Sequence, residues 1–376
     1  MEPVTGNKTI VVMSSHTPSL FWFRMDMMLE FIRRGYSVYA LGNEDESKWA
    51  DTFREKGITY EQIDVRRNGL NPLQDKKTMD SITEKLKRIR PDKIFTYQAK
   101  TVIYGSMAAR RVGITDCYPL IAGMGAVFIN NDIKSRLIRV VMTALYRSGM
   151  KKCPLVFFQN RDDERIFREN GIIKDQKIAM INGSGVNTEK FTVMPLPGTP
   201  AFLCICRLIA VKGIYEYLEA CRRIKAEYPD VRCLLVGPYD TNPSALKPED
   251  LEPYIRDGVI EYFGEQEDVR PYIGQASVYI LPAYREGTPK TNLEAMACGR
   301  AVITTDAPGC RETVIDGENG FLVPVKDVDS IYEKMKYFVE NPDVIETMGR
   351  KGRQMVEDRF DVNKVNAAIC KAMQII

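Results

Sequence analysis

The chain has 376 residues, a length that suits two domains better than one. Its hydrophobic content of 44% and charged content of 27% are ordinary for a globular protein that buries a sizeable core. The 53 basic and 50 acidic side chains leave a net charge of +3, which argues against a dedicated nucleic-acid-binding protein and confines any basic surface to a local patch.

Nine cysteines are scattered along the chain without a Cys-x-x-Cys pair, and His16 is the single histidine, so a Cys/His zinc site is not expected. Several cysteines lie in apolar segments, where a thiol behaves as a small hydrophobic group. We therefore expect a reducing cytosol and no structural disulfides. The N-terminus lacks the pattern of a signal peptide, and no stretch approaches the ~18 apolar residues of a membrane span.

The first half of the chain alternates strands with helices. Helices are predicted at residues 20–34, 76–90 and 101–112, and strands at 8–13, 36–41, 93–96, 118–121, 155–158 and 177–181. Continuous apolar strands that alternate with helices indicate a parallel sheet covered on both faces.

Residues 192–200 contain three prolines and predict a linker, after which the alternation restarts. The second half has predicted helices at 213–227, directly after Pro289, at 328–340 and at 343–376, and strands at 201–206, 231–236, 259–263, 276–281 and 301–304. The sequence therefore predicts two α/β domains, at 1–192 and 193–357, followed by a terminal helix at 358–376.

The strand predicted at 276–281 runs into a loop that contains Glu286, and a helix then begins near Pro289 with Glu294 just inside it. A helix N-terminus offers free N–H groups and a positive dipole end, which suit a diphosphate. Carboxylates beside such an anion would bind sugar hydroxyls, as a nucleotide sugar requires. The spacing by itself fits a surface loop and an ordinary helix equally well.

Arg207 and Lys212 follow the strand predicted at 201–206. Ligands of open α/β sheets bind beyond the carboxyl ends of the strands, and two cations there suit a diphosphate. Two solvated loop charges are the alternative.

These stretches resemble a known family. Residues 286–294, Glu-Gly-Thr-Pro-Lys-Thr-Asn-Leu-Glu, resemble the Glu-x7-Glu motif of retaining glycosyltransferases with the GT-B fold, known as glycosyltransferase group 1. Residues 207–213 resemble the family's Arg-x4-Lys-Gly element. The resemblance covers nearly the whole chain. It is strongest to bacterial enzymes that extend sugars on undecaprenyl diphosphate, such as the N-acetylgalactosaminyltransferase of bacterial N-glycan assembly.

The resemblance implies two Rossmann-like doubly wound domains that face a cleft, with the C-terminal helix crossing back to the first domain after a bend near Arg359-Phe360-Asp361. It implies that Arg207 and Lys212 hold the leaving diphosphate, that Glu286 faces the donor sugar and that Glu294 binds the ribose hydroxyls. The remaining donor-binding residues carried over from the family are Gly287, Thr288, Asn292, Leu293 and Gly237.

The acceptor side is predicted in the first domain. His16 lies at the end of the first strand and is a candidate catalytic residue that orients or deprotonates the acceptor, although it also suits a helix cap. Arg24 is a candidate for an acceptor phosphate, with an ordinary surface arginine as the alternative. Gly123 and Gly125 resemble a glycine-rich loop at the interdomain cleft of the family.

Residues 132–152 combine basic with apolar side chains, the basic ones being Lys134, Arg136, Arg139, Arg147, Lys151 and Lys152. A basic amphipathic helix can lie on an anionic membrane. The same spacing fits a helix that packs its apolar side on a sheet and turns its basic side outward. Because the resemblance implies a lipid-linked acceptor, we expect membrane contact.

The expected protein is a retaining glycosyltransferase, peripheral to the inner face of the cell membrane, that uses a UDP-sugar and a lipid-diphosphate-linked saccharide. UDP-N-acetylgalactosamine is the first candidate donor, followed by UDP-N-acetylglucosamine and UDP-galactose. No cofactor is expected, and the resemblance to GT-B enzymes implies that no bound metal is needed. Asp327-Val328-Asp329 has the Asp-x-Asp form that binds metal in another glycosyltransferase fold, but it is interpreted here as a helix N-cap. A GT-B UDP-sugar 2-epimerase and a catalytically silent subunit of a glycan-assembly complex remain as alternatives.

Overall fold

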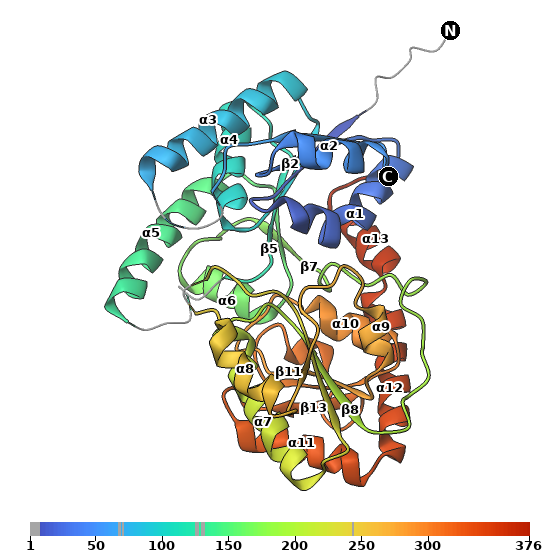
Figure 1. Ribbon diagram of the computed structural model, residues 1–376. Coiled ribbons are helices and arrows are strands. Elements are labelled where there is room, and N and C mark those ends of the chain that lie inside the picture. The colour runs from blue at the N-terminus through green and yellow to red at the C-terminus, as the bar shows by residue number, and fades with distance from the viewer. Residues whose placement is uncertain (1–7, 67–68, 70, 125–127, 129–131, 243) are drawn as a thin grey trace. The chain divides into compact units, whose positions relative to one another are not determined.

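A computed structural model describes residues 8–66, 69, 71–124, 128, 132–242 and 244–376. The chain divides into two compact units (Figure 1). The first comprises Met1–Ser184 together with Asn366–Ile376, and the second comprises Gly185–Val365.

The first unit contains a parallel seven-stranded sheet in the order β3-β2-β1-β4-β5-β6-β7. The strand order reverses direction between β1 and β4, as in a doubly wound fold. The inner strands β1, β4, β5 and β6 are almost entirely buried because helices cover both faces, which explains their continuous apolar sequences, whereas the edge strands β3 and β7 are partly exposed. Their bounds are β1 (Thr9–Met13), β2 (Ser37–Gly42), β3 (Ile58–Gln62), β4 (Lys93–Tyr97), β5 (Cys117–Ile121), β6 (Leu155–Phe158) and β7 (Lys177–Met180).

Two helices of the first unit, α1 and α3, begin three and four residues earlier than predicted. The first one starts at Thr17 rather than residue 20, because Pro18 is well suited to a first turn. The predicted helix at 101–112 begins as a π-helical turn, η1 (Thr101–Gly105). The α-helices are α1 (Thr17–Arg33), α2 (Glu46–Arg54), α3 (Pro72–Ile89), α4 (Ser106–Arg111), α5 (Ile133–Met150) and α6 (Arg161–Glu169).

Three elements of the first unit were not predicted: α2, β3 and α6. Only Phe53 of α2 is buried, so the segment carries little apolar periodicity. In the second unit α8, α9 and β13 were not predicted, and Leu251 is the only buried residue of α8.

The second unit contains a six-stranded sheet in the order β10-β9-β8-β11-β12-β13, again parallel and again reversed at one point, between β8 and β11. Its strands are β8 (Ala201–Ile205), β9 (Arg232–Val236), β10 (Glu261–Tyr262), β11 (Val278–Leu281), β12 (Ala301–Thr305) and β13 (Gly320–Val323). Its α-helices are α7 (Ile214–Glu227), α8 (Pro248–Arg256), α9 (Arg270–Gly274), α10 (Lys290–Ala297), α11 (Val328–Glu340) and α12 (Asp343–Met355).

Asp327 is the N-cap of α11, because its carboxylate accepts a hydrogen bond from the Ser330 amide at 3.0 Å. The N-cap prediction for Asp327-Val328-Asp329 is therefore confirmed. The segment predicted as helical at 343–376 consists of α12, a π-helical turn η5 (Val356–Phe360) and α13 (Val362–Ala372), and it is interrupted at the bend predicted near Arg359-Phe360-Asp361. Asp361 interrupts it with an extended backbone.

The boundary between the units lies between Ser184 and Gly185, upstream of the proline-rich segment at 192–200. That segment packs on the second unit, where the guanidinium of Arg300 donates hydrogen bonds to the carbonyl oxygens of Met194 and Pro195 at 2.6 and 2.7 Å. Gly185 itself passes so close to Val362 that a Cβ would lie 2.7 Å from its Cα, and its φ is +71°. A glycine is therefore required there.

All nine cysteines are free thiols. Cys204 and Cys206 place their sulfur atoms 3.7 Å apart, with Cys204 buried in the core of the second unit. No helix in the described part of the chain is long and apolar enough to span a membrane.

Candidate functional site

The candidate donor site of the second unit lies where its strand order reverses. Arg207 and Lys212 follow β8, and Glu286 follows β11, the neighbouring strand. The carboxyl ends of parallel strands meet at one edge, and the reversal point opens a crevice there. The topology thus brings together side chains that are far apart in sequence.

Lys212 and Glu286 form an ion pair, with the Lys212 ammonium donating to Glu286 Oε1. Both side chains are mostly buried, at 19% and 15% exposure. Their loops are held together by backbone contact, since the Tyr284 amide donates to the Val211 carbonyl at 3.0 Å. Gly213 lies so near Pro282 that a Cβ would sit 2.0 Å from its carbonyl oxygen, so the glycine after Lys212 is required by this approach.

Arg207 is held by Asp240, whose Oδ2 accepts from its Nη1 at 2.6 Å. Asp240 was not predicted as a site residue. Its signal was the turn Asp-Thr-Asn, in which the Asn242 amide donates to Asp240 Oδ1 at 2.8 Å. Asp240 orients the guanidinium at the carboxyl end of the sheet.

The loop after β12 supports Glu286 from the other side. The Glu286 amide donates to the Pro308 carbonyl at 2.9 Å. Gly309 has φ +86° and lies where a Cβ would be 2.2 Å from the Glu286 carbonyl oxygen. Sequence reasoning missed both residues, although Pro-Gly directly after a strand is a recognisable turn signal.

Helix α10 begins beside this loop. Its N-cap is Pro289, which has no side chain able to cap the first amides, and those amides have no intrahelical acceptor. Two oxygen atoms at the same place, Thr288 Oγ1 and Asn292 Oδ1, are buried without a hydrogen-bond partner among the described residues. Leu293 differs, because its amide donates to the Pro289 carbonyl at 3.4 Å. Buried unpaired polar atoms are costly, so their gathering here favours a polar ligand.

Glu294 is buried on the first turns of α10, with 8% of its surface exposed. Burial raises the pKa of its carboxyl, and the nearby Lys290 ammonium, 3.7 Å away, partly opposes this. A buried carboxylate of this kind gains stability when a ligand donates hydroxyl hydrogen bonds to it.

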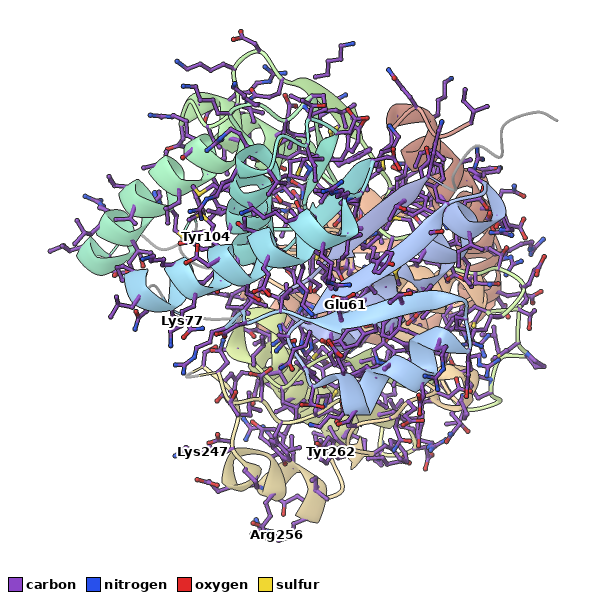
Figure 2. All side chains as sticks on the ribbon, turned by 90° about the horizontal axis from the view of Figure 1, so that it is seen from above. Glu61, Lys77, Tyr104, Lys247, Arg256 and Tyr262 are labelled. Carbon is purple, nitrogen blue, oxygen red and sulfur yellow. The ribbon has the colours of Figure 1, made fainter. Side chains whose placement is uncertain are left out.

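Gly237 closes the site at the end of β9. Its φ is +146°, and a Cβ would lie 1.8 Å from the Cys206 carbonyl oxygen. The Tyr262 hydroxyl, labelled in Figure 2, donates to the Gly237 carbonyl at 2.9 Å. Only glycine fits between these strand ends. Gly287, also predicted here, is buried beside Glu286.

In the first unit, polar side chains gather where the strand order reverses between β1 and β4. Gln98, which follows β4, adopts φ +70°, an unusual conformation for a residue other than glycine. Its Oε1 accepts from Ser14 Oγ at 3.0 Å and from the Ser15 amide and hydroxyl at 3.1 and 2.8 Å. Gln98 thus ties the end of β4 to the loop that carries His16. Sequence reasoning missed it.

His16 occupies the N-cap position of α1, but its side chain makes no capping hydrogen bond. The alternative interpretation of His16 as a helix cap is thus confirmed for its position, while its imidazole takes no part in the capping. Gly123 follows β5 with φ +104°, a conformation that favours glycine. Gly125 lies outside the described residues.

Arg24 is buried, with 3% of its surface exposed, so its interpretation as an ordinary surface arginine is wrong. Its guanidinium lies 5.0 Å from the ring centre of Tyr97 and 5.7 Å from that of Phe95. Burial lowers its pKa to about 10. Its Nε has no hydrogen-bond partner among the described residues.

Residues 199–341, all within the second unit, match the family of glycosyl transferases group 1. The chain carries a group 1 glycosyltransferase domain. The family predicted from the motifs at 207–213 and 286–294 is confirmed.

Two of the proteins to which the chain is similar have names that place them in bacterial glycan assembly. The N,N'-diacetylbacillosaminyl-diphospho-undecaprenol alpha-1,3-N-acetylgalactosaminyltransferase of Campylobacter jejuni is 27% identical over 337 residues, covering 86% of this chain and 87% of that one. The capsular polysaccharide biosynthesis glycosyltransferase CapM of Staphylococcus aureus is 29% identical over 154 residues, covering 41% of this chain and 40% of that one.

Solved structures establish the fold of the glycosyltransferase as GT-B, as predicted. Sucrose-phosphate synthase from Thermosynechococcus elongatus matches with a TM-score of 0.81 at 18% identity, over 98% of both chains. HepE from Anabaena, in complex with UDP and glucose, matches with a TM-score of 0.76 at 16% identity, over 98% of this chain and 100% of that one.

Replacing Glu294 by Gln should stabilise the ligand-free glycosyltransferase near neutral pH. Since the folded-state pKa of Glu294 lies above the ordinary 4.5, the wild type loses stability as the pH rises through that raised pKa, whereas Gln does not titrate. We expect a melting temperature about 2–4 °C higher, the shift for about 1 kcal/mol in a unit of this size.

The ribose-binding role predicted for Glu294 adds a second expectation. The same substitution should then weaken UDP binding about fivefold, because a hydrogen bond from a ribose hydroxyl to a charged carboxylate is stronger than one to a neutral amide. Thermal melting from pH 4 to pH 8, with and without UDP, measures both effects. Equal melting curves for wild type and variant across this range would contradict the assignment of a buried, destabilising carboxylate.

Proposed function

We propose that this glycosyltransferase moves a sugar, with N-acetylgalactosamine as the first candidate, from a UDP-sugar to a lipid-diphosphate-linked saccharide, with retention of the anomeric configuration. The observation that carries the proposal is the Lys212–Glu286 pair beside Arg207 at the strand-order reversal of the second unit. The name of the Campylobacter relative, an N-acetylgalactosaminyltransferase on an undecaprenol diphosphate, supports the substrates. HepE with UDP and glucose supports a UDP-sugar donor.

In the proposed reaction the donor diphosphate binds on the first amides of α10 and between the cations Arg207 and Lys212. Charge develops on this diphosphate as the sugar bond breaks, and fixed cations stabilise such charge without reorganising. Glu286, paired to Lys212, faces the sugar, while Glu294 accepts from the ribose hydroxyls. The acceptor oxygen enters on the face from which the diphosphate leaves, and the leaving phosphate helps to take the acceptor proton.

We propose further that no metal is needed, because Arg207 and Lys212 supply the positive charge for the diphosphate. His16, Arg24, Gly123 and Gly125 are proposed for the acceptor side. Arg24 is buried, and its Nε has no hydrogen-bond partner in the described part of the first unit, which supports an anionic acceptor group.

Helix α5 supports a contact with the membrane that holds such an acceptor. Its apolar side chains Ile133, Leu137, Val140 and Val141 are exposed by 86%, 70%, 68% and 44%. They recur at helical spacing and form one face. Because these four side chains are exposed, they are not packed on the sheet, as the alternative interpretation of α5 required. Their exposure favours a peripheral position of the protein on an anionic membrane.

The proposal predicts that purified protein releases UDP from one UDP-sugar only when a short undecaprenyl-diphosphate-linked saccharide is present. A panel of UDP-sugars, with and without such acceptors, identifies both substrates, and EDTA should leave the rate unchanged. Product with inverted anomeric configuration would contradict retention. UDP-sugar consumed without acceptor and without UDP release would indicate an epimerase instead.

A further inference from the structure

A basic hollow of about 760 Å³ lies at the C-terminal end of α5 in the first unit. It is formed by the last turn of α5 and the segment after α6 that leads into β7. Four lysines line it, Lys151, Lys152, Lys174 and Lys177. No transferase step proposed above uses them.

The walls of the hollow are fixed by hydrogen bonds that leave the lysines available. Arg147 donates from Nε to the Gly171 carbonyl and from Nη2 to the Asn170 carbonyl, each at 2.8 Å. Gln176 donates to the Met150 carbonyl at 3.1 Å. These bonds join α5 to the segment after α6. The two walls of the hollow are therefore held together by hydrogen bonds, so the hollow is not a gap between independent loops.

The charge of the hollow is one-sided. Among the described residues that line it, Asp175 is the only acid, beside the four lysines. None of these four lysines forms an ion pair within the described ranges. The exposed arginines of α6 and α7 differ, because most of them pair with a carboxylate of their own helix, as Arg165 does with Asp162. Unpaired ammonium groups around a concave surface attract anions.

The hollow continues the exposed apolar face of α5. Ala144 lines the hollow and is exposed, and it lies one turn after Val140 and Val141 on the same side of the helix. Figure 1 shows α5 as a long green helix at the margin of its unit. A surface that places an apolar stripe next to lysines matches a bilayer, where acyl chains and phosphates are neighbours.

We propose that the hollow binds the phosphate headgroups of anionic phospholipids in the bilayer on which the stripe Ile133, Leu137, Val140 and Val141 lies. This deepens the membrane contact proposed above and rests on it. The apolar side chains of the stripe insert into the bilayer, and the lysines of the hollow bind anionic lipids in preference to neutral ones. Each lysine close to such a surface strengthens binding about fivefold, an effect that salt screens.

The test is co-sedimentation of the full chain, without nucleotide or acceptor, with phosphatidylcholine vesicles and with vesicles that also contain phosphatidylglycerol. The wild type should prefer the anionic vesicles and lose that preference at high salt. The variant Lys151→Gln/Lys174→Gln should bind anionic vesicles about 25-fold more weakly. Leu137→Ser should weaken binding to both kinds of vesicle.

The matched control is Lys247→Gln/Lys351→Gln, which removes the same charge from exposed positions of the second unit. Lys247, labelled in Figure 2, lies directly before α8. The control variant should bind like the wild type. Equal binding of the hollow variant and the control, or equal binding of the wild type to both vesicles, would overturn the proposal. A further result would also overturn it: inorganic phosphate binds the wild type but not the hollow variant, while the two proteins bind anionic vesicles equally well. Vesicle binding without UDP release would refute only the proposed transfer reaction.

Discussion

Replacing Glu286 by Gln is expected to lower sugar transfer by roughly 100-fold or more while the protein still folds and binds UDP. The carboxylate pairs with the Lys212 ammonium at the strand-order reversal, so its loss removes a fixed charge from the place where the reacting sugar is proposed to bind. UDP binding should persist because the amides of α10, Arg207 and Glu294 remain. UDP release and UDP titration by calorimetry measure the two effects.

The control is Glu249→Gln on α8, an exposed carboxylate that approaches Lys247 at 3.7 Å. It should transfer sugar at the wild-type rate. If Glu286→Gln instead kept full transfer, the carboxylate would have no part in the reaction. If it lost UDP binding with a normal fold, Glu286 would belong to nucleotide binding rather than to the sugar.

Replacing Arg300 by Ala is expected to destabilise the second unit by at least about 3 kcal/mol, because each buried acceptor left unsatisfied costs about 1–3 kcal/mol. Arg300 is fully buried. Its guanidinium donates to the backbone carbonyls of Ile273, Ala276, Met194, Cys298, Pro195 and Gly274. The melting temperature should fall by about 6–12 °C for that loss.

The variant Arg300→Met separates the effect of the lost hydrogen bonds from the effect of the lost side-chain volume. Methionine fills much of the space of the arginine but has no N–H group to donate to the carbonyls. It should be destabilised nearly as much as Arg300→Ala. Arg222→Ala on α7, whose exposed guanidinium pairs with Glu219 at 2.7 Å, should melt close to the wild type, since exposed pairs contribute little. A Met variant as stable as the wild type would show that the carbonyls find water or other donors.

The sequence predicted both sheets except for the strands β3 and β13, because parallel strands buried on both faces appear as continuous apolar runs, as in β4 and β8. It also predicted the donor residues that belong to local motifs, such as Lys212 before Gly213 and Glu286 before α10. The partners of those residues escaped it. Asp240 and Gly309 follow other strands, β9 and β12, and they lie near Arg207 and Glu286 only because all these strands end at the same edge of the sheet. Residue spacing within a local motif does not predict such contacts.

Arg24 and α5 show most clearly that the burial of a helix face could not be predicted from the sequence. Helical spacing identifies which side chains share a face, but burial of that face depends on neighbours from elsewhere in the chain. Arg24 is covered because Phe95 and Tyr97 of β4 lie beneath α1. The apolar side of α5 remains exposed because α5 packs on η1 and α4 through its other residues, among them the buried Tyr146 and Met150.

The sequence alone thus determined the α/β class, the two sheets and the residue types at the carboxyl ends of β8 and β11, because these follow from local periodicity and contiguous motifs. Only the tertiary structure decided that Lys212 pairs with Glu286, that Arg24 is buried and that α5 turns its apolar face outward. Each of these depends on which distant segments pack together, and in a doubly wound fold that is set by the order of the strands.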